Sequence, residues 1–190
     1  MPYKFGEDID YSIDLLKFSD KDDIQSFSCG NEKLDFYIKS EIFGETELDL
    51  SDGLHFKVCI SGTNKIIGFF SLANSGIIHQ LDNYIHLLPA IKIDVFAIDK
   101  EFQKMHFNIE SKEAKNPDDH YYFSDQIMGE VVKHCRNVGE TQTLVDYILI
   151  YADKKAHRFY QRNLFADYQP FMQREQSQEI NALIPMYMQL

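Results

Sequence analysis

The sequence of 190 residues contains no tryptophan, only three cysteines, five prolines and nine glycines. It has no run of about 18 apolar residues, the length that a membrane-spanning helix needs. Its N-terminus has no apolar core of the kind found in a secretory signal. The cysteines Cys29, Cys59 and Cys135 are far apart and match no metal-binding spacing. We therefore expect a cytoplasmic protein with reduced cysteines, no membrane segment and no metal site.

Positive charge is also scarce, because 30 acidic side chains outnumber 19 basic ones and give a net charge of −11. The excess is concentrated in residues 1–60, which hold 14 acidic and 6 basic side chains. Since contacts to phosphates dominate affinity for nucleic acids, this balance argues against a nucleic-acid partner. An acidic N-terminal part can attract a cationic amine, or it can simply keep the surface soluble.

Hydrophobic periodicity predicts a single α/β domain over residues 1–190, with a central mixed sheet of the α+β type flanked by helices. Strands are expected at 11–18, 55–61, 65–72, 91–98, 146–152 and 181–188, and helices at 32–43, from 124 onward and from 156 onward. Asn31 and Ser124 are the expected N-caps of the first two helices. Pro185 predicts an edge position or a bulge for the last strand. Residues 73–90 are expected to form an irregular connection.

The helix expected after the strand 146–152 carries one notable face. Ala156, Phe159, Tyr160 and Asn163 fall at i, i+3, i+4 and i+7 and therefore share a side. A phenol at the start of a helix beside a sheet can donate a proton to a group lying across the strand ends. By spacing alone, the simpler interpretation is that both aromatic residues belong to the core.

Residues 156–165, Ala-His-Arg-Phe-Tyr-Gln-Arg-Asn-Leu-Phe, resemble the last motif of the GNAT superfamily of acyl-CoA-dependent N-acyltransferases. In that family the tyrosine is commonly the general acid that protonates the leaving CoA thiolate, so the resemblance implies this role for Tyr160. The family's glycine is replaced by Leu164, and we therefore expect a turn of different shape after the helix.

Two further stretches resemble a GNAT branch that includes many toxin-like members. They are residues 27–38, which begin Phe-Ser-Cys-Gly, and residues 66–72, Ile-Ile-Gly-Phe-Phe-Ser-Leu. The predicted order of elements is similar to the GNAT fold as well. The resemblance implies an N-acetyltransferase that moves an acetyl group from acetyl-CoA to a primary amine by direct attack. The amine would belong to a small molecule or a protein, and a homodimer is the default because family relatives are often dimers.

The toxin-like branch implies an aminoacyl-tRNA substrate, which an acidic chain can approach only through a local basic groove. Four basic residues lie close together in the sequence and are candidates for it: Lys154, Lys155, Arg158 and Arg162. They are more simply interpreted as a solvated helix face.

The main departure from the family follows the strand at 91–98. GNAT enzymes have a glycine-rich loop there, which lets backbone N–H groups approach the CoA pyrophosphate. The corresponding stretch holds Gln103, Lys104, His106 and Asn108. Asparagine tolerates positive φ, so part of the loop shape is expected to survive, and Lys104 or His106 would supply charge. His106 is equally an ordinary loop histidine.

An insertion at about 109–123 separates this loop from the next helix, where the family enters its helix directly. Its aromatic residues would either cover the cofactor as a lid or form a surface excursion, and we favour the surface excursion. The changed loop also leaves a second function open. In that alternative the chain is a catalytically inactive GNAT-like scaffold that binds a partner or a ligand.

By resemblance, the strand at 91–98 holds the pantetheine arm and supplies an oxyanion-binding N–H through the main chain of four residues: Val95, Phe96, Ala97 and Ile98. Asp94 on this strand and Glu41 at the end of the first helix are candidates for the general base. Many relatives use only ordered water, and each carboxylate is equally a solvated surface group.

Overall fold

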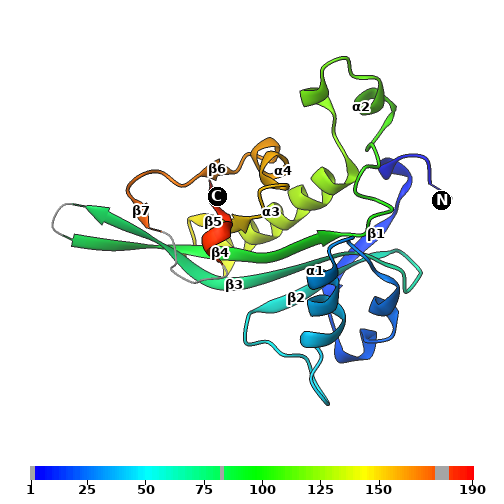
Figure 1. The fold of residues 1–190 in the computed structure, drawn as a ribbon, viewed down its shortest axis with the longest axis horizontal. Coiled ribbons are helices and arrows are strands. Elements are labelled where there is room, and N and C mark those ends of the chain that lie inside the picture. Colours follow the sequence, from blue (N-terminus) through cyan, green and yellow to red (C-terminus); the bar gives the residue numbers. More distant parts are fainter. Residues whose placement is uncertain (1–2, 82–83, 174–179) are drawn as a thin grey trace. The chain divides into compact units, whose positions relative to one another are not determined.

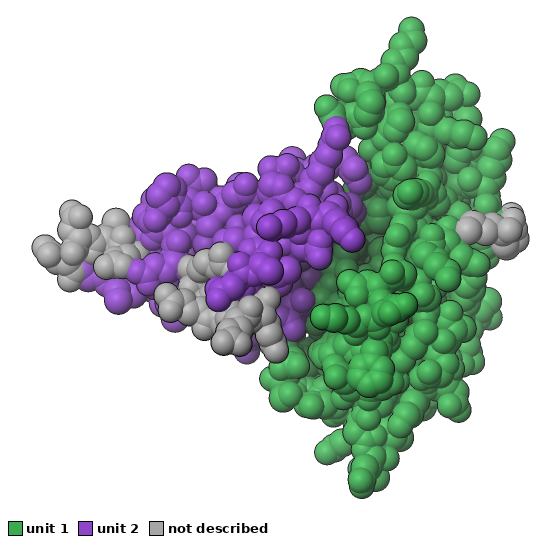
Figure 2. All heavy atoms as spheres, in the orientation of Figure 1, with its two compact units in different colours: residues 1–72, 95–127 green, residues 73–94, 128–190 purple. Residues whose placement is uncertain are grey.

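The computed structural model describes residues 3–81, 84–173 and 180–190. Contacts between Cα atoms divide the chain into two compact units, which Figure 2 colours separately. Unit 1 comprises Met1–Leu72 and Val95–Ile127, and unit 2 comprises Ala73–Asp94 and Met128–Leu190. That the whole chain acts as a single domain stays a prediction.

Unit 1 contains an antiparallel arrangement of β1 (Tyr11–Leu15), β2 (Leu54–Ile60) and the first part of β3 (Ile66–Leu81), visible in Figure 1. The predicted hairpin between β2 and β3 is confirmed. Its turn contains Gly62 at φ 72°, a left-handed conformation that glycine adopts without a steric penalty.

The first helix also follows its prediction, since α1 (Glu32–Phe36) continues into a π-helical turn, η4 (Tyr37–Glu41). The side chain of Asn31 accepts a hydrogen bond from the Leu34 N–H at 3.3 Å, which confirms the predicted cap. The helix packs on an apolar core cluster of unit 1, which includes Leu16, Ile24, Phe27, Ile38, Ile42, Phe43, Cys59, Ile66, Phe69 and Ala97. Burial of these side chains is the dominant stabilising contribution in this unit.

The remaining strands are β4 (Tyr84–Ile98), β5 (Tyr147–Ala152), β6 (Ala166–Asp167), β7 (Met172–Gln173) and β8 (Ile184–Gln189). Hydrogen bonding orders the strands β1-β2-β3-β4-β5-β8-β6, with β7 beside β3. The β4–β5 pair is parallel, whereas β5–β8 and β6–β8 are antiparallel. The predicted mixed sheet is therefore confirmed.

The other α-helices are α2 (Ile109–Glu113), α3 (Phe123–Thr141) and α4 (His157–Arg162). Short 3₁₀ turns lie at η1 (Gly6–Asp8), η2 (Phe18–Asp20), η3 (Asp23–Ser26), η5 (Pro117–Asp119) and η6 (Ile180–Ala182). Among the helices of the described residues, none has the length and apolar character needed to cross a bilayer.

Three sequence predictions are wrong in detail. Ser124 is not the cap of α3 but its second residue; the Tyr122 N–H at the helix start instead donates to the Asp125 carboxylate at 2.8 Å. Residues 73–90 are not an irregular connection, because β3 and β4 extend through most of this stretch. Strand β8 lies between β5 and β6 and is therefore not an edge strand, although its ladder with β6 begins only at Met186, just after Pro185.

Candidate active site

Tyr160 lies in α4, which follows β5 through a turn closed by a hydrogen bond from the Ala156 N–H to the Asp153 carbonyl (2.9 Å). The tyrosine is only 6% exposed. Its ring makes edge-to-face contacts with the rings of Phe159 and Phe165, with centroids 5.1 and 5.8 Å away. These contacts fix the orientation of the ring. The burial agrees with both sequence interpretations, the core aromatic and the proton donor.

The turn after α4 keeps the conformation that a glycine would give. Leu164 has φ 68° and is the one non-glycine residue with positive φ in the described part of the chain. The Phe165 N–H donates to the Tyr160 carbonyl and the Leu164 N–H to the Gln161 carbonyl, both at 3.0 Å. This is the Schellman arrangement that normally ends in glycine. The expectation of a differently shaped turn is therefore wrong.

Burial raises the pKa of the Tyr160 phenol far above its usual range, and the nearby Asp153 carboxylate raises it further. Both effects disfavour the phenolate, because a negative charge would lie in a low-dielectric site beside another negative charge. Tyr160 is therefore protonated throughout the physiological pH range. Such a group can donate a proton but cannot serve as a base.

The two carboxylates predicted as bases differ in their surroundings. Asp94 is exposed on β4, where its Oδ1 forms an ion pair with the Nζ of Lys92 at 2.9 Å. Residues two apart on a strand point to the same face, which explains this pair. Glu41 is an exposed residue at the end of η4. The catalytic role of either carboxylate stays a prediction.

Strand β5 pairs with only the middle of β4. The parallel ladder with β5 covers Ala90, Ile91 and Lys92 and ends there, whereas β4 continues to Ile98. The four residues predicted to hold the pantetheine arm therefore lie beyond this ladder; they are Val95, Phe96, Ala97 and Ile98. Ala97 is buried, and with Val95 it packs in the core of unit 1.

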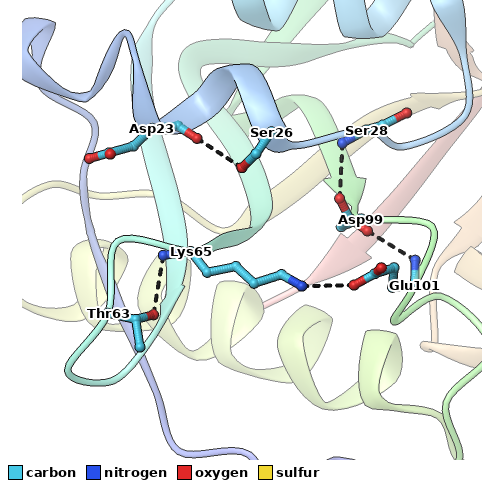
Figure 3. Close-up of polar contacts among 7 residues, drawn as sticks. All are labelled: Asp23, Ser26, Ser28, Thr63, Lys65, Asp99 and Glu101. Atoms are coloured by element: carbon cyan, nitrogen blue, oxygen red, sulfur yellow. Dashed lines mark hydrogen bonds and ion pairs between the residues drawn. The ribbon is translucent and has the colours of Figure 1, made fainter. Parts of the chain in front are cut away.

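Asp99 anchors the turn that follows β4, as Figure 3 shows. One carboxylate oxygen accepts from the Ser28 N–H and the other from the Glu101 N–H, both at 2.9 Å. The residue is 5% exposed, and its own N–H donates to the Ile67 carbonyl. The sequence analysis missed Asp99, although an aspartate directly after an apolar strand is a recognised turn former.

Gln103 joins the same junction through its side chain. Its Nε2 donates to the carbonyls of Cys29 (2.8 Å) and Ile98 (2.9 Å). The Asp35 carboxylate accepts from the Ser28 hydroxyl and the Cys29 N–H, both at 2.8 Å. Residues 27–35, which resemble the toxin-like branch, therefore tie the first helix to the turn after β4. Gln103 helps to hold this junction together, and its contact with cofactor stays a prediction.

Asn108 does not adopt the left-handed conformation that was expected of it. Its φ is −146°, and its Oδ1 accepts from the Ser111 N–H at 2.8 Å, so that it caps α2. His106 is half-buried and lies against the rings of His120 and Tyr122, with centroids 5.1 and 4.8 Å away. The expectation that Asn108 preserves the glycine loop is therefore wrong. Cofactor contacts of His106 and Asn108 remain predictions.

The insertion closes on itself at its base (Figure 1). The Phe107 N–H donates to the Tyr121 carbonyl at 2.9 Å, and the Phe123 N–H to the Met105 carbonyl at 2.8 Å. The hydroxyl of Ser111 makes two bonds of 2.6 Å to the backbone of Tyr121. The insertion is therefore an ordered structure, and its use as a lid stays a prediction.

These residues fit an acyl-CoA only in part. The end of β4, in unit 1, offers main-chain groups of the kind that can bind a pantetheine arm, and Tyr160, in unit 2, is a buried, protonated phenol. A glycine cradle for the pyrophosphate is not formed by residues 103–108, because this stretch contains no glycine and Asn108 is extended. The start of α3 also carries the buried carboxylate of Asp125, which disfavours an anion there.

No protein-family model and no curated protein matches the sequence. Solved structures do resemble it. A crystal structure described as a bacterial toxin is 12% identical and has a TM-score of 0.65, covering 95% of this chain and 91% of the toxin. A Tyr-to-Phe mutant of KacT is 16% identical with a TM-score of 0.63, covering 94% of each chain. AtaT complexed with acetyl-methionyl-tRNAfMet is 15% identical with a TM-score of 0.63, covering 95% of each chain.

The chain therefore has the fold of these toxins along nearly its whole length, and the predicted GNAT-like fold is confirmed. At such low sequence identity the likeness establishes the fold alone. Activity, substrates and partners have to be argued from the residues of this chain.

Proposed function

We propose that the protein is an acyl-CoA-dependent N-acyltransferase that moves an acetyl group from acetyl-CoA to a primary amine. The observation that carries the proposal is Tyr160, a buried phenol whose ring is held between Phe159 and Phe165 and whose helix ends in the Schellman turn. An aromatic residue that only packs in the core needs no hydroxyl, whereas a general acid needs a hydroxyl that carries its proton.

Acetyl-CoA, when bound, supplies a thioester carbonyl that an amine can attack and a sulfur that leaves as a thiolate. Tyr160 gives its hydroxyl proton to this sulfur as the C–S bond breaks, and it regains a proton from the solvent. Desolvation raises the energy of a phenolate, but it raises that of a buried thiolate as well. Hydrogen bonding from Tyr160 therefore stabilises the leaving group where water cannot.

The main chain of β4 beyond its ladder with β5 would hold the pantetheine arm, through Val95, Phe96, Ala97 and Ile98. Strand-like pairing uses backbone groups and is independent of side-chain identity. A backbone N–H in this stretch would also stabilise the charge that develops on the carbonyl oxygen.

The attacking amine must lose a proton, and Asp94 is the better placed of the two candidates by sequence. Its Oδ1 is already engaged by the Lys92 ammonium at 2.9 Å, however. We therefore assign proton removal to solvent, with Asp94 attracting the cationic amine. The variant Asp94→Asn should then raise KM more than it lowers kcat.

The ligands of the structural neighbours support this choice of chemistry. AtaT has been solved with acetyl-CoA and the C-terminus of the antitoxin AtaR, and also with acetyl-methionyl-tRNAfMet. KacTA has been solved with DNA. We accordingly propose the amine of an aminoacyl-tRNA as the first acceptor to test, and an antitoxin-like protein as the partner class.

The experiment is an acetyl-transfer assay on wild type and Tyr160→Phe, with Tyr187→Phe as the matched control. Loss of general acid catalysis should lower kcat by about 10²–10⁴-fold with acetyl-CoA affinity nearly unchanged. The control removes a hydroxyl from another tyrosine of unit 2 and should keep its activity. Equal activity of all three proteins would contradict the role of Tyr160.

One observation favours a second candidate, the inactive GNAT-like scaffold. The turn after β4 forms no glycine cradle for a pyrophosphate: Gln103 donates to the Cys29 carbonyl, and Asn108 is extended and caps α2. A scaffold would keep the fold without binding acetyl-CoA, so equilibrium binding of acetyl-CoA separates the two candidates.

A further inference from the structure

An open pocket of unit 1 lies beside the turn that replaces the glycine loop. It has a volume of about 300 Å³, at the small end of the range for small-molecule sites. Its lining comes from three segments, the N-terminal residues 3–5, the turn at 101–106 and helix α2, and consists of Tyr3, Lys4, Phe5, Glu101, Lys104, Met105, His106 and Lys112. Phe5 and Met105 are each 9% exposed and give it an apolar floor.

The pocket is positively charged in a chain that is strongly acidic overall. Three of its residues are lysines, Lys4, Lys104 and Lys112, although the chain carries a net charge of −11. Within the described residues, no ion pair to a carboxylate is recorded for any of these three ammonium groups. Uncompensated lysines that meet in one concave site create a local positive potential.

The single carboxylate of the lining does not neutralise them. The Oε2 of Glu101 lies 2.7 Å from the Nζ of Lys65 (Figure 3). Lys65 does not belong to the pocket lining. This ion pair lowers the pKa of Glu101, so the carboxylate is ionised and already paired. The three lysines therefore remain available to an added anion.

The backbone around the pocket is held in place by hydrogen bonds. The Gly6 N–H donates to the His106 carbonyl at 3.0 Å, and the Glu7 N–H to the Phe107 carbonyl at 2.8 Å. Gly6 is packed so closely that a Cβ there would come within 2.9 Å of the Phe123 side chain. The N-terminal segment that carries Lys4 is thus fixed against the turn that carries Lys104.

We propose that this pocket binds the phosphate groups of CoA, with the ammonium groups of Lys4, Lys104 and Lys112 replacing the backbone N–H groups of a glycine loop. The inference rests on the proposed function. Lysine is well suited to this task, because a compact, mobile ammonium group binds phosphate as a point charge without requiring a fixed backbone shape. His106 lines the same pocket and adds an imidazole that can donate a hydrogen bond to a phosphate oxygen.

Equilibrium binding to the purified full chain tests the proposal, with acetyl-CoA, CoA, adenosine 3′,5′-bisphosphate and pantetheine as probes. In the double variant Lys104→Gln/Lys112→Gln, the affinity for the three phosphate-bearing probes should fall about tenfold or more. Pantetheine, which has no phosphate, should bind both proteins equally. The control Lys33→Gln, an exposed lysine of α1 in the same unit, should behave as wild type.

A second measurement, the pKa of His106, detects an anion in the pocket independently of binding affinity. Desolvation, together with His120 and Lys112, lowers the pKa of His106. An anion in the pocket favours the imidazolium, so adding adenosine 3′,5′-bisphosphate should raise the pKa of His106 in an NMR titration. A resonance of His106 that does not respond at saturating probe would place the phosphates elsewhere and overturn the proposal.

The failure of this site and the failure of the proposed function give different results. Equal CoA affinity in wild type and the double variant would overturn the lysine site while leaving the transferase in place. Phosphate-dependent binding that needs the lysines, without acetyl transfer to any amine tested, would support the site and remove the transferase. Wild type that binds none of the phosphate-bearing probes would overturn both.

Discussion

The turn after α4 and the turn after β4 both lack glycines that the GNAT motifs resembled by the sequence carry, yet their backbones differ in opposite ways. After α4, Leu164 adopts the left-handed conformation of the missing glycine, and the Schellman hydrogen bonds around Tyr160 are intact. After β4, Asn108 is extended, and the polar side chains of Asp99 and Gln103 take over the turn. The turn after α4, beside the proposed general acid, keeps the backbone shape that a glycine would give. The turn after β4, proposed to lie near the cofactor phosphates, has a different backbone.

The difference has a physical reason. A helix end needs a single residue with positive φ, and a leucine that is 81% exposed can adopt it at a cost of roughly 1–2 kcal/mol. A phosphate cradle needs several backbone N–H groups exposed together, and no side chain can reproduce their close approach. Without those glycines, an anion has to be bound by side chains instead of backbone N–H groups. The lysine pocket provides such side chains.

The largest expected effect concerns the rebuilt turn. Asp99→Ala leaves two N–H groups, of Ser28 and Glu101, without their charged acceptor, and we expect a loss of about 3–5 kcal/mol in the free energy of unfolding. Urea denaturation measures this loss, with Asp52→Ala, in an exposed loop, as the control. If both variants lose less than about 1 kcal/mol, Asp99 does not anchor the turn.

The second prediction concerns pH and the turn after α4. Because burial raises the pKa of Tyr160, the unfolded chain releases this proton above about pH 10 while the folded chain retains it. Stability should therefore fall with rising pH, with Tyr160 contributing up to about 1.4 kcal/mol per pH unit. Denaturation of wild type and Tyr160→Phe between about pH 9 and 11 isolates this contribution. Parallel pH profiles would show that the phenol ionises as readily in the folded state.

The smallest effect tests the retained backbone shape. Leu164→Gly should stabilise the protein by about 0.5–1 kcal/mol, because glycine accepts φ 68° without strain. The matched control is Leu144→Gly, at a residue that is 86% exposed and has no positive φ. The midpoint temperature of thermal unfolding should rise for Leu164→Gly and fall or stay constant for Leu144→Gly. The opposite order would mean that the turn after α4 carries no such strain.

Local signals explain what the sequence could predict. The cap at Asn31, the hairpin at Gly62 and the helix carrying Tyr160 each depend on a few adjacent residues, and all three are confirmed. The long ends of β3 and β4 were missed because this hairpin arm is polar and partly exposed, with Tyr84 and Ile85 over 60% exposed. Only a few residues of this stretch are buried, such as Ile77 and Ala90, so the alternation that marks a strand is weak.

Contacts between distant segments explain what the sequence could not predict. Asp99 and Ser28 are 71 residues apart, and Gln103 and Cys29 are 74 apart, so neither hydrogen bond has a local pattern. The lysine pocket likewise joins the N-terminus to an insertion more than a hundred residues away. Residue types along the chain indicated a missing glycine loop, but only the fold shows which charges meet beside it.

The most direct test of the account is thermal unfolding of the wild-type chain with and without acetyl-CoA, using a nucleotide without a thioester as the control. Ligand at about 100 times its dissociation constant should add about 2.7 kcal/mol of stability. For a chain of this size the account predicts a rise of roughly 5–11 °C in the midpoint. No shift at millimolar acetyl-CoA would contradict it and leave the scaffold as the function of this fold.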